Sequence, residues 1–365
     1  MSKYSFQLIP KAAEEYLTDK RRVVYEDHRK EFAEWLSVFG KNPERVEGYA
    51  EDTVKRTMYR IGVFERFVWE REGFVVPLTH AHAHDYMMYL AKGDFTGSHR
   101  HLCRAALKRY FRWRTHQYNE DEWEPPFTFT KDNNTQPREF FTVEERKKIR
   151  QAALDYGSIP SYTSISADER EKWKKYVSQR LRKPLAEVEP DDWKEVNGWK
   201  FTSMVWTSLD AGLRPIEVGR ATTDWVDLEN GALRIPVEDS SKNRDNWTVS
   251  ITMRTAEALE RWLEERENYP LYEDTDALWL TREGNPYTPQ PLRRLILKLC
   301  EEAGISTENR KISWYAIRHS VGTYMTREED LAATQAQLRH KSPQTTMRYD
   351  QVPIEDRRDA LDKMG

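Results

Sequence analysis

The sequence predicts a mainly α-helical protein of two domains, the second of which carries a small antiparallel sheet. Three observations support this fold class. Apolar residues recur at spacings of three and four over most of the chain, and alternating segments occur only near residues 225–251. The length of 365 residues is about twice that of a usual single domain. The 13 Trp, 18 Tyr and 13 Phe residues supply enough apolar surface for two cores.

The first 120 residues are predicted to be helical throughout. Helical patterns cover about 11–40, 50–72, 83–92 and 98–116. We assign residues 1–45 to an N-terminal helical extension and residues 46–120 to a helical core domain. Polar, proline-bearing residues over 121–140 then predict a linker. The second domain is assigned to residues 141–365.

The second domain is predicted to open with a capping box formed by Thr142 and Glu145. Residues 157–200 follow as a charged helical insertion to which we assign no role. An Asn230-Gly231 turn joins strand segments at 225–228 and 232–235, and residues 247–251 supply a third strand. Helical patterns return at 254–268, 290–304, 313–326 and 330–339.

The overall composition argues against a membrane protein. Apolar runs stay far short of the ~20 residues that span a bilayer, and the N-terminus opens no apolar signal core. Two cysteines 197 positions apart suit a reducing compartment. We therefore expect a cytoplasmic protein with no membrane partner. The 58 Lys and Arg against 61 Asp and Glu give a net charge of −3, which by itself argues against nucleic acid.

The charge is distributed unevenly, however. Residues 95–119 hold six Lys and Arg and no Asp or Glu. Four of the six recur at a spacing of four and so line one helix face: Arg100, Arg104, Lys108 and Arg112. Because like charges at this spacing repel, such a helix predicts contact with a polyanion such as DNA. A solvated face, or one paired with acids of another helix, is the alternative.

A run of alternating histidines, His80, His82 and His84, raises the question of a metal site. Alternation suits a strand, yet this stretch leads directly into a helix, and no cluster of Cys or carboxylates completes a ligand set. We therefore predict no metal and no cofactor.

Four separated segments of the second domain carry residue types suited to phosphate chemistry. Each is weak alone, because an arginine near a glutamate is most often an ion pair. Their order along the chain is the informative feature. The segments are Asp210-Ala-Gly-Leu-Arg214-Pro-Ile-Glu217, Ser240-Ser-Lys242-Asn-Arg244, Ser313-Trp-Tyr315-Ala-Ile-Arg318-His319, and Leu338-Arg-His340 with Tyr349 nine residues later.

In this order the residues resemble the tyrosine recombinase (phage integrase) family, of archaeal or bacterial type. The family pattern is an Arg, a Lys in a strand turn, a His-x-x-Arg, a His or Trp, and a nucleophilic Tyr. The separations of 104, 22 and nine residues from the first arginine onward are typical. The matching positions are Arg214, Lys242, Arg318, His340 and Tyr349, with Glu217 as a support for the first arginine.

The resemblance covers about 142–352 well and about 50–117 more loosely. It implies a SAM-like DNA-binding domain followed by a catalytic domain of the DNA breaking-rejoining enzyme fold. It also implies that the two domains clamp duplex DNA between them. The implied activity is site-specific recombination or integration, as in mobile elements.

The chemistry that the family performs explains these residue types. Two arginines stabilise the phosphate as its negative charge grows. Tyr349 attacks phosphorus, forms a 3′-phosphotyrosine and frees a 5′-hydroxyl, so the bond energy is kept and neither ATP nor metal is needed. The resemblance assigns to Lys242 the protonation of the leaving oxygen and to His340 a hydrogen bond to the phosphate. The alternative for Lys242 is that it belongs to an ordinary polar turn, since Arg244 lies two residues further along the chain.

Two positions depart from the family pattern. Tyr315 stands where the family has the first His, and Arg339 stands where a Gly usually precedes the later His. A tyrosine donates a hydrogen bond but is a poor base near neutral pH, because a phenol has a pKa of about 10. His319 does not simply replace it, because it lies about one helical turn, ~6 Å, further along the axis. Tyr315 is therefore either a site residue or a core aromatic, and Arg339 adds positive charge beside the phosphate.

The resemblance also implies an assembly. We expect a homo-tetramer on paired DNA sites and a monomer or dimer in isolation, with the tail 353–365 docking on a neighbouring subunit. Two alternatives stay open at this point. One is relaxation without strand exchange by a type IB topoisomerase-like monomer. The other is a degenerate relative that binds DNA without cutting it, for which Tyr315 is the main support.

Overall fold

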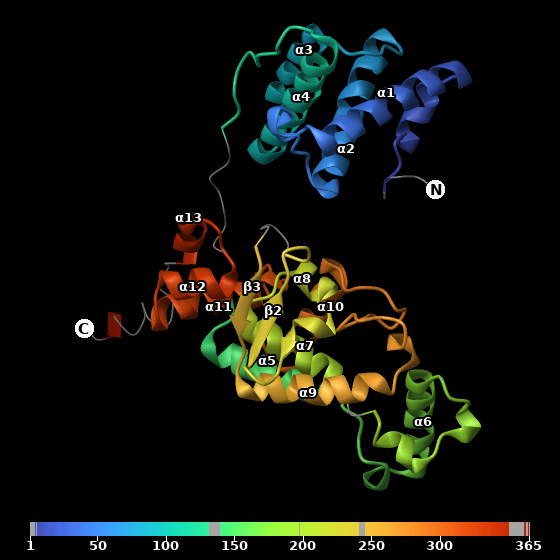
Figure 1. Ribbon diagram of the computed structural model, residues 1–365, viewed down its shortest axis with the longest axis vertical. Coiled ribbons are helices and arrows are strands. Elements are labelled where there is room, and N and C mark those ends of the chain that lie inside the picture. Colours follow the sequence, from blue (N-terminus) through green and yellow to red (C-terminus); the bar gives the residue numbers. More distant parts are fainter. Residues whose placement is uncertain are drawn as a thin grey trace. The chain divides into compact units, whose positions relative to one another are not determined.

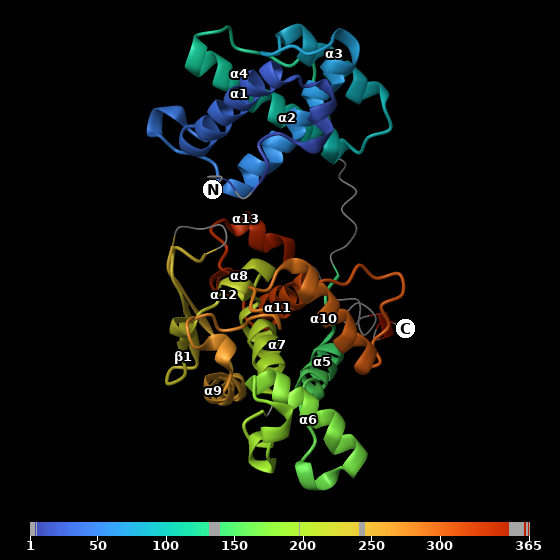
Figure 2. The same ribbon diagram turned by 90° about the vertical axis from the view of Figure 1, so that its right-hand side faces the viewer.

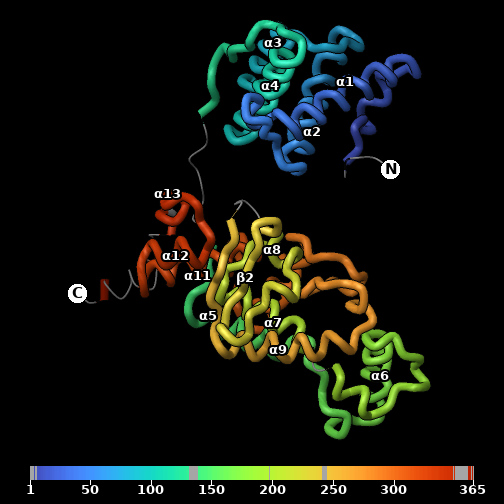
Figure 3. Tube along the Cα trace, in the orientation of Figure 1, coloured from blue at the N-terminus to red at the C-terminus, as the bar shows by residue number. Residues whose placement is uncertain are grey.

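The computed structural model describes residues 4, 6–130, 139–196, 198–240, 245–349, 361, 362 and 364. The chain divides into two compact units, Met1–Gln136 and Pro137–Gly365, which can be followed by colour along the chain in Figures 1 and 3. The described residues are mostly helical with one small antiparallel sheet, which confirms the predicted fold class. No helix in the described part of the chain has the length and apolar character that a bilayer crossing requires.

Unit 1 is a helical bundle built around aromatic side chains. Its helices are α1 (Asp19–Val38), α2 (Glu51–Glu72), α3 (His80–Lys92) and α4 (Gly97–Tyr118), preceded by a short 3-10 helix at Lys11–Tyr16. Phe32 of α1, Phe64 of α2 and Trp113 of α4 are buried in one hydrophobic core. The segments assigned to an extension and to a core domain therefore share this core.

The beginning of the predicted linker packs on unit 1. Trp123 is only 4% exposed, and its ring lies 5.3 Å from the ring of Phe111. Burial of an aromatic side chain of this size stabilises a fold by roughly 2–3 kcal/mol. Unit 1 thus extends past α4, and residues 131–138 of the predicted linker lie outside the described residues.

Unit 2 is built around one central helix. The helix α7 (Trp199–Ala211) is buried along nearly its whole length and packs against α5, α9 and α11. The other helices, labelled in Figures 1 and 2, are α5 (Val143–Asp155), α6 (Ala167–Leu181), α8 (Pro215–Arg220), α9 (Met253–Glu267), α10 (Pro289–Glu302), α11 (Tyr315–Glu328), α12 (Leu331–Leu338) and α13 (Pro343–Thr346). The capping box predicted at Thr142 and Glu145 is present at the start of α5.

The sheet is a three-stranded antiparallel meander in the order β1-β2-β3. Its strands are β1 (Val226–Asp227), β2 (Ala232–Ile235) and β3 (Trp247–Ser250). Gly231 takes a φ of 56° in the predicted hairpin turn, and Leu233 pairs with Val249 on the buried face. Residues 241–244, which include the predicted site residue Lys242, lie outside the described residues.

The insertion at 157–200 contains α6 and three short 3-10 helices, Tyr162–Ser164, Leu185–Glu187 and Pro190–Trp193. It joins the core where α7 begins. There Glu265 of α9 accepts hydrogen bonds from the backbone N–H groups of Gly198 (3.1 Å) and Trp199 (2.7 Å). Figures 1 and 2 place α6 at the end of unit 2 opposite α8 and α13.

Candidate functional site

The candidate site is organised at the C-terminal end of α7. The last four carbonyls of a helix have no partner within it, and the helix dipole makes this end attractive to cations. Here four side chains from other segments donate to the carbonyls: Arg146 to Leu209 (2.8 Å), Gln337 to Asp210 (3.0 Å), Arg339 to Ala211 (2.8 Å) and Arg318 to Gly212 (2.6 Å).

Gly212 makes this convergence possible. It ends α7 with a φ of 58°, a left-handed conformation that glycine adopts at little cost. A Cβ at this position would lie 2.6 Å from Cδ2 of Leu338. The chain therefore turns directly from α7 into Arg214 and α8 while α12 packs against the turn.

A buried carboxylate, Glu217, holds two arginines together. It lies in the first turn of α8 and accepts hydrogen bonds from the backbone N–H of Arg214 (2.7 Å), from Nη1 of Arg214 (2.6 Å) and from Nη2 of Arg339 (2.8 Å). Burial by itself would raise the pKa of Glu217, but the charges of Arg339, Arg214 and Arg318 lower that pKa to about 2. The carboxylate is thus ionised at neutral pH.

Arg339 has a structural role that its place in the sequence does not reveal. It takes a φ of 57° at the end of α12, which costs roughly 1–2 kcal/mol for a residue with a Cβ. Its side chain is 1% exposed and donates to Ala211, Gln337, Gly212 and Glu217. Arg339 therefore sits behind the site as a buried support.

The cluster carries more positive than negative charge. Three guanidinium groups, those of Arg214, Arg318 and Arg339, surround the single carboxylate of Glu217. Burial, followed by the charges of Arg339 and Arg214, lowers the pKa of Arg318 to about 9. A buried, under-neutralised cation of this kind is stabilised by an added anion.

His340 is tied into the same cluster. Its Nε2 lies 3.0 Å from Nη2 of Arg318, and its Nδ1 lies 3.0 Å from Oγ1 of Thr346. A guanidinium group only donates, so we assign Nε2 as the acceptor and place the proton on Nδ1, which donates to Thr346. Both ring nitrogens of His340 are thus in contact with neighbouring side chains.

Tyr349 packs directly onto this histidine. Its ring stacks on the ring of His340 with centroids 5.7 Å apart and an interplanar angle of 12°. The ring also lies against Gly322 of α11, where an added Cβ would come within 2.5 Å of the ring. The tyrosine is 5% exposed, and its Oη lies 3.1 Å from Nδ1 of His319.

Tyr349 contacts His319, a residue to which we assigned no role in the site from the sequence. We reasoned from the one-turn separation that His319 would not take over the role of the residue at 315. In the structure Tyr315 is 43% exposed and stacks on His319 at 6.0 Å, whereas His319 itself meets the Tyr349 hydroxyl. The three-residue spacing of His319 and Gly322, which places them on one helix face beneath Tyr349, is the sequence signal that was missed.

The predicted DNA-contacting row on α4 is partly engaged within unit 1. Arg100 donates to the carbonyl of Gly93 (2.8 Å), and Arg112 donates to the carbonyl of Gly40. Lys108 is exposed, and its Nζ lies 4.0 Å from Oε2 of Glu124. Together with Arg104, which is partly buried, these residues stay a prediction as DNA ligands.

The three alternating histidines have structural partners. His80 lies edge-on to Phe111, His82 completes a capping box with Thr79, and His84 lies 6.3 Å from the ring of Trp123. Two other predicted features, Lys242 and most of the tail 353–365, fall outside the described residues.

Comparison with known proteins identifies the domain that carries this cluster. A model of the phage integrase family matches residues 195–355, a range that includes every predicted residue of the cluster. This part of the chain is therefore similar to the phage integrase family. The resemblance predicted from the order of Arg214, Arg318, His340 and Tyr349 is thereby confirmed.

Three curated relatives show how far the likeness extends along the chain. Tyrosine recombinase XerC of Chlamydia caviae is 27% identical over 165 residues, 45% of this chain and 50% of the relative. Tyrosine recombinase XerC 2 of Ralstonia nicotianae is 24% identical over 85% of this chain and 79% of its own length. Type 1 fimbriae regulatory protein FimE of Escherichia coli is 30% identical over 34% of this chain and 60% of its own length.

Solved structures share the fold. The XerH site-specific recombinase, bound to a palindromic difH substrate after cleavage, gives a TM-score of 0.58 at 18% identity over 95% of this chain and 89% of XerH. A lambda integrase dimer bound to a COC′ core site gives a TM-score of 0.50 at 15% identity over 94% of this chain and 87% of the integrase. At these identities the likeness establishes the fold of the chain.

The cluster predicts a measurable cost for Glu217→Gln. The substitution leaves two buried guanidinium groups without their carboxylate, so we expect the free energy of unfolding of unit 2 to fall by about 3 kcal/mol at pH 7. Urea-dependent hydrogen exchange of peptides from α7 and α9 reports unit 2 separately. Glu229→Gln, at an exposed hairpin carboxylate, is the matched control and should change stability by less than about 0.5 kcal/mol.

Glu217→Gln should also change how the free energy of unfolding depends on pH. The pKa of Glu217 is lower in the folded chain than in the unfolded chain, so its stabilising effect is present above the ordinary pKa of about 4.3 and is lost as the pH falls toward about 2. The difference between wild type and Glu217→Gln should be constant from pH 8 to 5 and shrink below pH 4.5. A difference that grows on acidification would contradict this account.

Proposed function

We propose that the protein is a site-specific DNA recombinase that cuts and rejoins duplex DNA through a 3′-phosphotyrosine on Tyr349. One observation carries the proposal. The Tyr349 hydroxyl lies 3.1 Å from His319, and its ring stacks on His340, which is bonded to Arg318 of the under-neutralised arginine cluster. The relatives named tyrosine recombinase XerC support the same activity.

In the proposed reaction Arg214 and Arg318 bind the scissile phosphate. Attack on phosphorus increases the negative charge on its non-bridging oxygens. Guanidinium groups that are held rigidly in a desolvated site stabilise this growing charge more than the ground state, which lowers the barrier. Glu217 and Arg339 position Arg214 and do not touch the substrate.

The proton of Tyr349 passes to His319 in this scheme. The bond from Oη to phosphorus forms while the bond from phosphorus to the 5′-oxygen breaks. Nδ1 of His319 takes the tyrosine proton, since imidazole is the side chain best suited to accept a proton near neutral pH. We assign to Lys242 the protonation of the leaving 5′-oxygen, and the scheme calls for no metal. The reverse transfers rejoin the strand.

We propose that four copies act on two paired duplex sites, because exchange of two duplexes requires four strand cleavages. Unit 1 would contact DNA through the row Arg100, Arg104, Lys108 and Arg112. The likeness of the whole chain to XerH in a complex with its difH substrate supports DNA as the partner of both units.

The assignment predicts a covalent complex that depends on Tyr349. A binding site is first recovered by selection from a randomised duplex pool with Tyr349→Phe protein. A nicked suicide substrate of that site is then incubated with each protein and analysed on a denaturing gel. We expect a covalent adduct for wild type and none for Tyr349→Phe. An absent wild-type adduct, or one that survives the substitution, would refute the proposal.

A second measurement separates exchange from relaxation. Paired sites on two labelled duplexes should yield recombinant strands and Holliday junctions with wild-type protein. Relaxation of supercoiled plasmid without any recombinant product would instead indicate a topoisomerase-like activity.

The placement of His319 predicts unequal effects of two neighbouring substitutions. His319→Gln removes the group that receives the tyrosine proton, so the single-turnover cleavage rate should fall by about 10²–10⁴-fold with unchanged DNA affinity. Tyr315→Phe keeps the exposed ring and should cleave within about threefold of wild type. Rapid-quench cleavage and filter binding measure the two quantities. A severe defect in Tyr315→Phe with normal cleavage by His319→Gln would reverse the assignment.

A further inference from the structure

A second cationic site lies in unit 2, in a cavity between the insertion and the core. The cavity has a volume of about 120 Å³, well above the 10–15 Å³ or so that one water needs. Four of its nine lining residues are cationic and none is acidic. The four are Arg180 and Arg182 at the end of α6, Lys200 in the first turn of α7, and Arg282 in the segment before α10.

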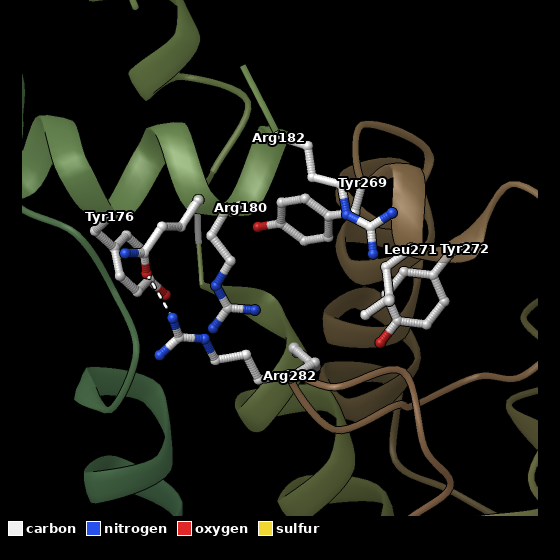
Figure 4. Close-up of a pocket in the computed structure, with 9 residues that line it drawn as sticks. Tyr176, Arg180, Arg182, Tyr269, Leu271, Tyr272 and Arg282 are labelled. Atoms are coloured by element: carbon white, nitrogen blue, oxygen red, sulfur yellow. Dashed lines mark hydrogen bonds between the residues drawn. The ribbon is translucent and has the colours of Figure 1, made fainter. Parts of the chain in front are cut away.

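Aromatic and polar groups, rather than directly paired carboxylates, surround these cations. Burial disfavours the charge of Arg180, but Tyr176, Tyr269 and Glu265 together raise its pKa. In the described part of the chain, none of the four lies within 4.0 Å of a carboxylate oxygen. Arg282 donates to Oε1 of Gln179 (3.0 Å), and Lys200 donates to the carbonyl of Leu280 (3.0 Å). In the view of Figure 4 the side chains of Arg180 and Arg282 approach each other, whereas the side chain of Arg182 extends toward Tyr269 and Leu271.

The buried carboxylate of Glu265 is already engaged in hydrogen bonds to other groups. Glu265 accepts hydrogen bonds from the backbone of Gly198 and Trp199 and from the hydroxyl of Tyr269. Burial raises the pKa of Glu265, and the hydrogen bonds from Tyr269, Trp199 and Gly198 oppose this rise. Glu265 therefore caps the start of α7, and the net charge of the side chains that line the cavity is positive.

Lys200 is the least expected member of the group. It is 5% exposed, and a buried ammonium group without an anionic partner is strongly unfavourable. Burial, together with the charge of Arg180, lowers the pKa of Lys200 to about 7. An anion in the cavity would restore the charged form of the lysine and also neutralise the arginines around it.

We propose that this cavity binds a small tetrahedral oxyanion of the phosphate class, held by Arg180 and Arg282 together with Lys200. The guanidinium forks match the oxygens of such an ion, and the cavity has room for one such group. The bound anion joins α6 of the insertion to α7 and to the segment before α10. The insertion thereby acquires a ligand-dependent link to the core, and the proposal does not depend on recombinase activity.

Sulfate is the suitable probe, because it has the geometry of phosphate and does not titrate between pH 6 and 9. Calorimetric titration of the full chain, with sodium gluconate holding the ionic strength constant, should give one saturable site per chain at pH 6.5. Arg282→Gln, at an exposed side chain, and Arg180→Gln should each weaken binding at least tenfold. Lys175→Gln, an exposed charge change on the same helix and outside the cavity, is the matched control and should bind as wild type does.

The affinity should also fall as the pH rises. Groups that face Lys200 are Arg180 of α6, Glu265 of α9, Glu283 beside Arg282, and the hydroxyls of Tyr272 and Tyr287, whose pKa values burial raises. With the pKa of Lys200 near 7, sulfate affinity should drop more than tenfold between pH 6 and 8.5. In Lys200→Met the binding should be weaker and this pH dependence lost.

Two results would overturn the proposal. One is the absence of saturable sulfate binding, or sulfate binding that neither Arg282→Gln nor Arg180→Gln changes. The other is displacement of sulfate by short duplex DNA, together with a loss of DNA affinity in Arg282→Gln, which would reassign the cavity to the nucleic-acid backbone.

Discussion

The candidate site depends on the way α7 ends. Four carbonyls that a helix leaves unpaired are concentrated there, and side chains from α5, α11, α12 and the α12–α13 turn donate to them. Gly212 lets the chain leave α7 at once, so that Arg214 and Glu217 follow within five residues. The dipole of α7 and the carboxylate of Glu217 hold three guanidinium groups together against their mutual repulsion. Without the helix dipole and the carboxylate, the desolvation cost of burying these cations would exceed the electrostatic stabilisation that they gain.

This arrangement reconciles a net charge of −3 with the proposed DNA substrate. Charge is local: the acids lie mostly on exposed surface, while the guanidinium groups of Arg318 and Arg339 are almost fully buried. A desolvated cation interacts with a phosphate more strongly than one in water, because the effective dielectric constant is lower and less salt screens it. The site is therefore complementary to a phosphate even though the whole chain is not basic. The same argument applies to the cavity beside α6, whose lining residues also include cationic side chains and no acidic ones.

Much of this was predictable from short-range sequence signals. The spacing of apolar residues predicts the helices closely, and Asn230-Gly231 places the hairpin. The order of Arg214, Arg318, His340 and Tyr349 was enough to predict the family. Contacts that depend on long-range packing were not predictable. The approach of Tyr349 to His319 requires the chain after α13 to return over α11, and the burial of Arg339 requires α12 to pack on Gly212. Neither follows from separations along the chain.

The claim that the arginine cluster stabilises the negative charge of a phosphate has one direct test. Single-turnover cleavage is measured for wild type and Arg214→Gln, with a normal scissile phosphate and with a neutral methylphosphonate at the same position. Circular dichroism checks that the variant is folded. If Arg214 stabilises the growing negative charge, the rate lost on substitution should be at least tenfold smaller on the neutral linkage. An equal loss on both substrates would contradict the account and reduce Arg214 to a purely structural residue.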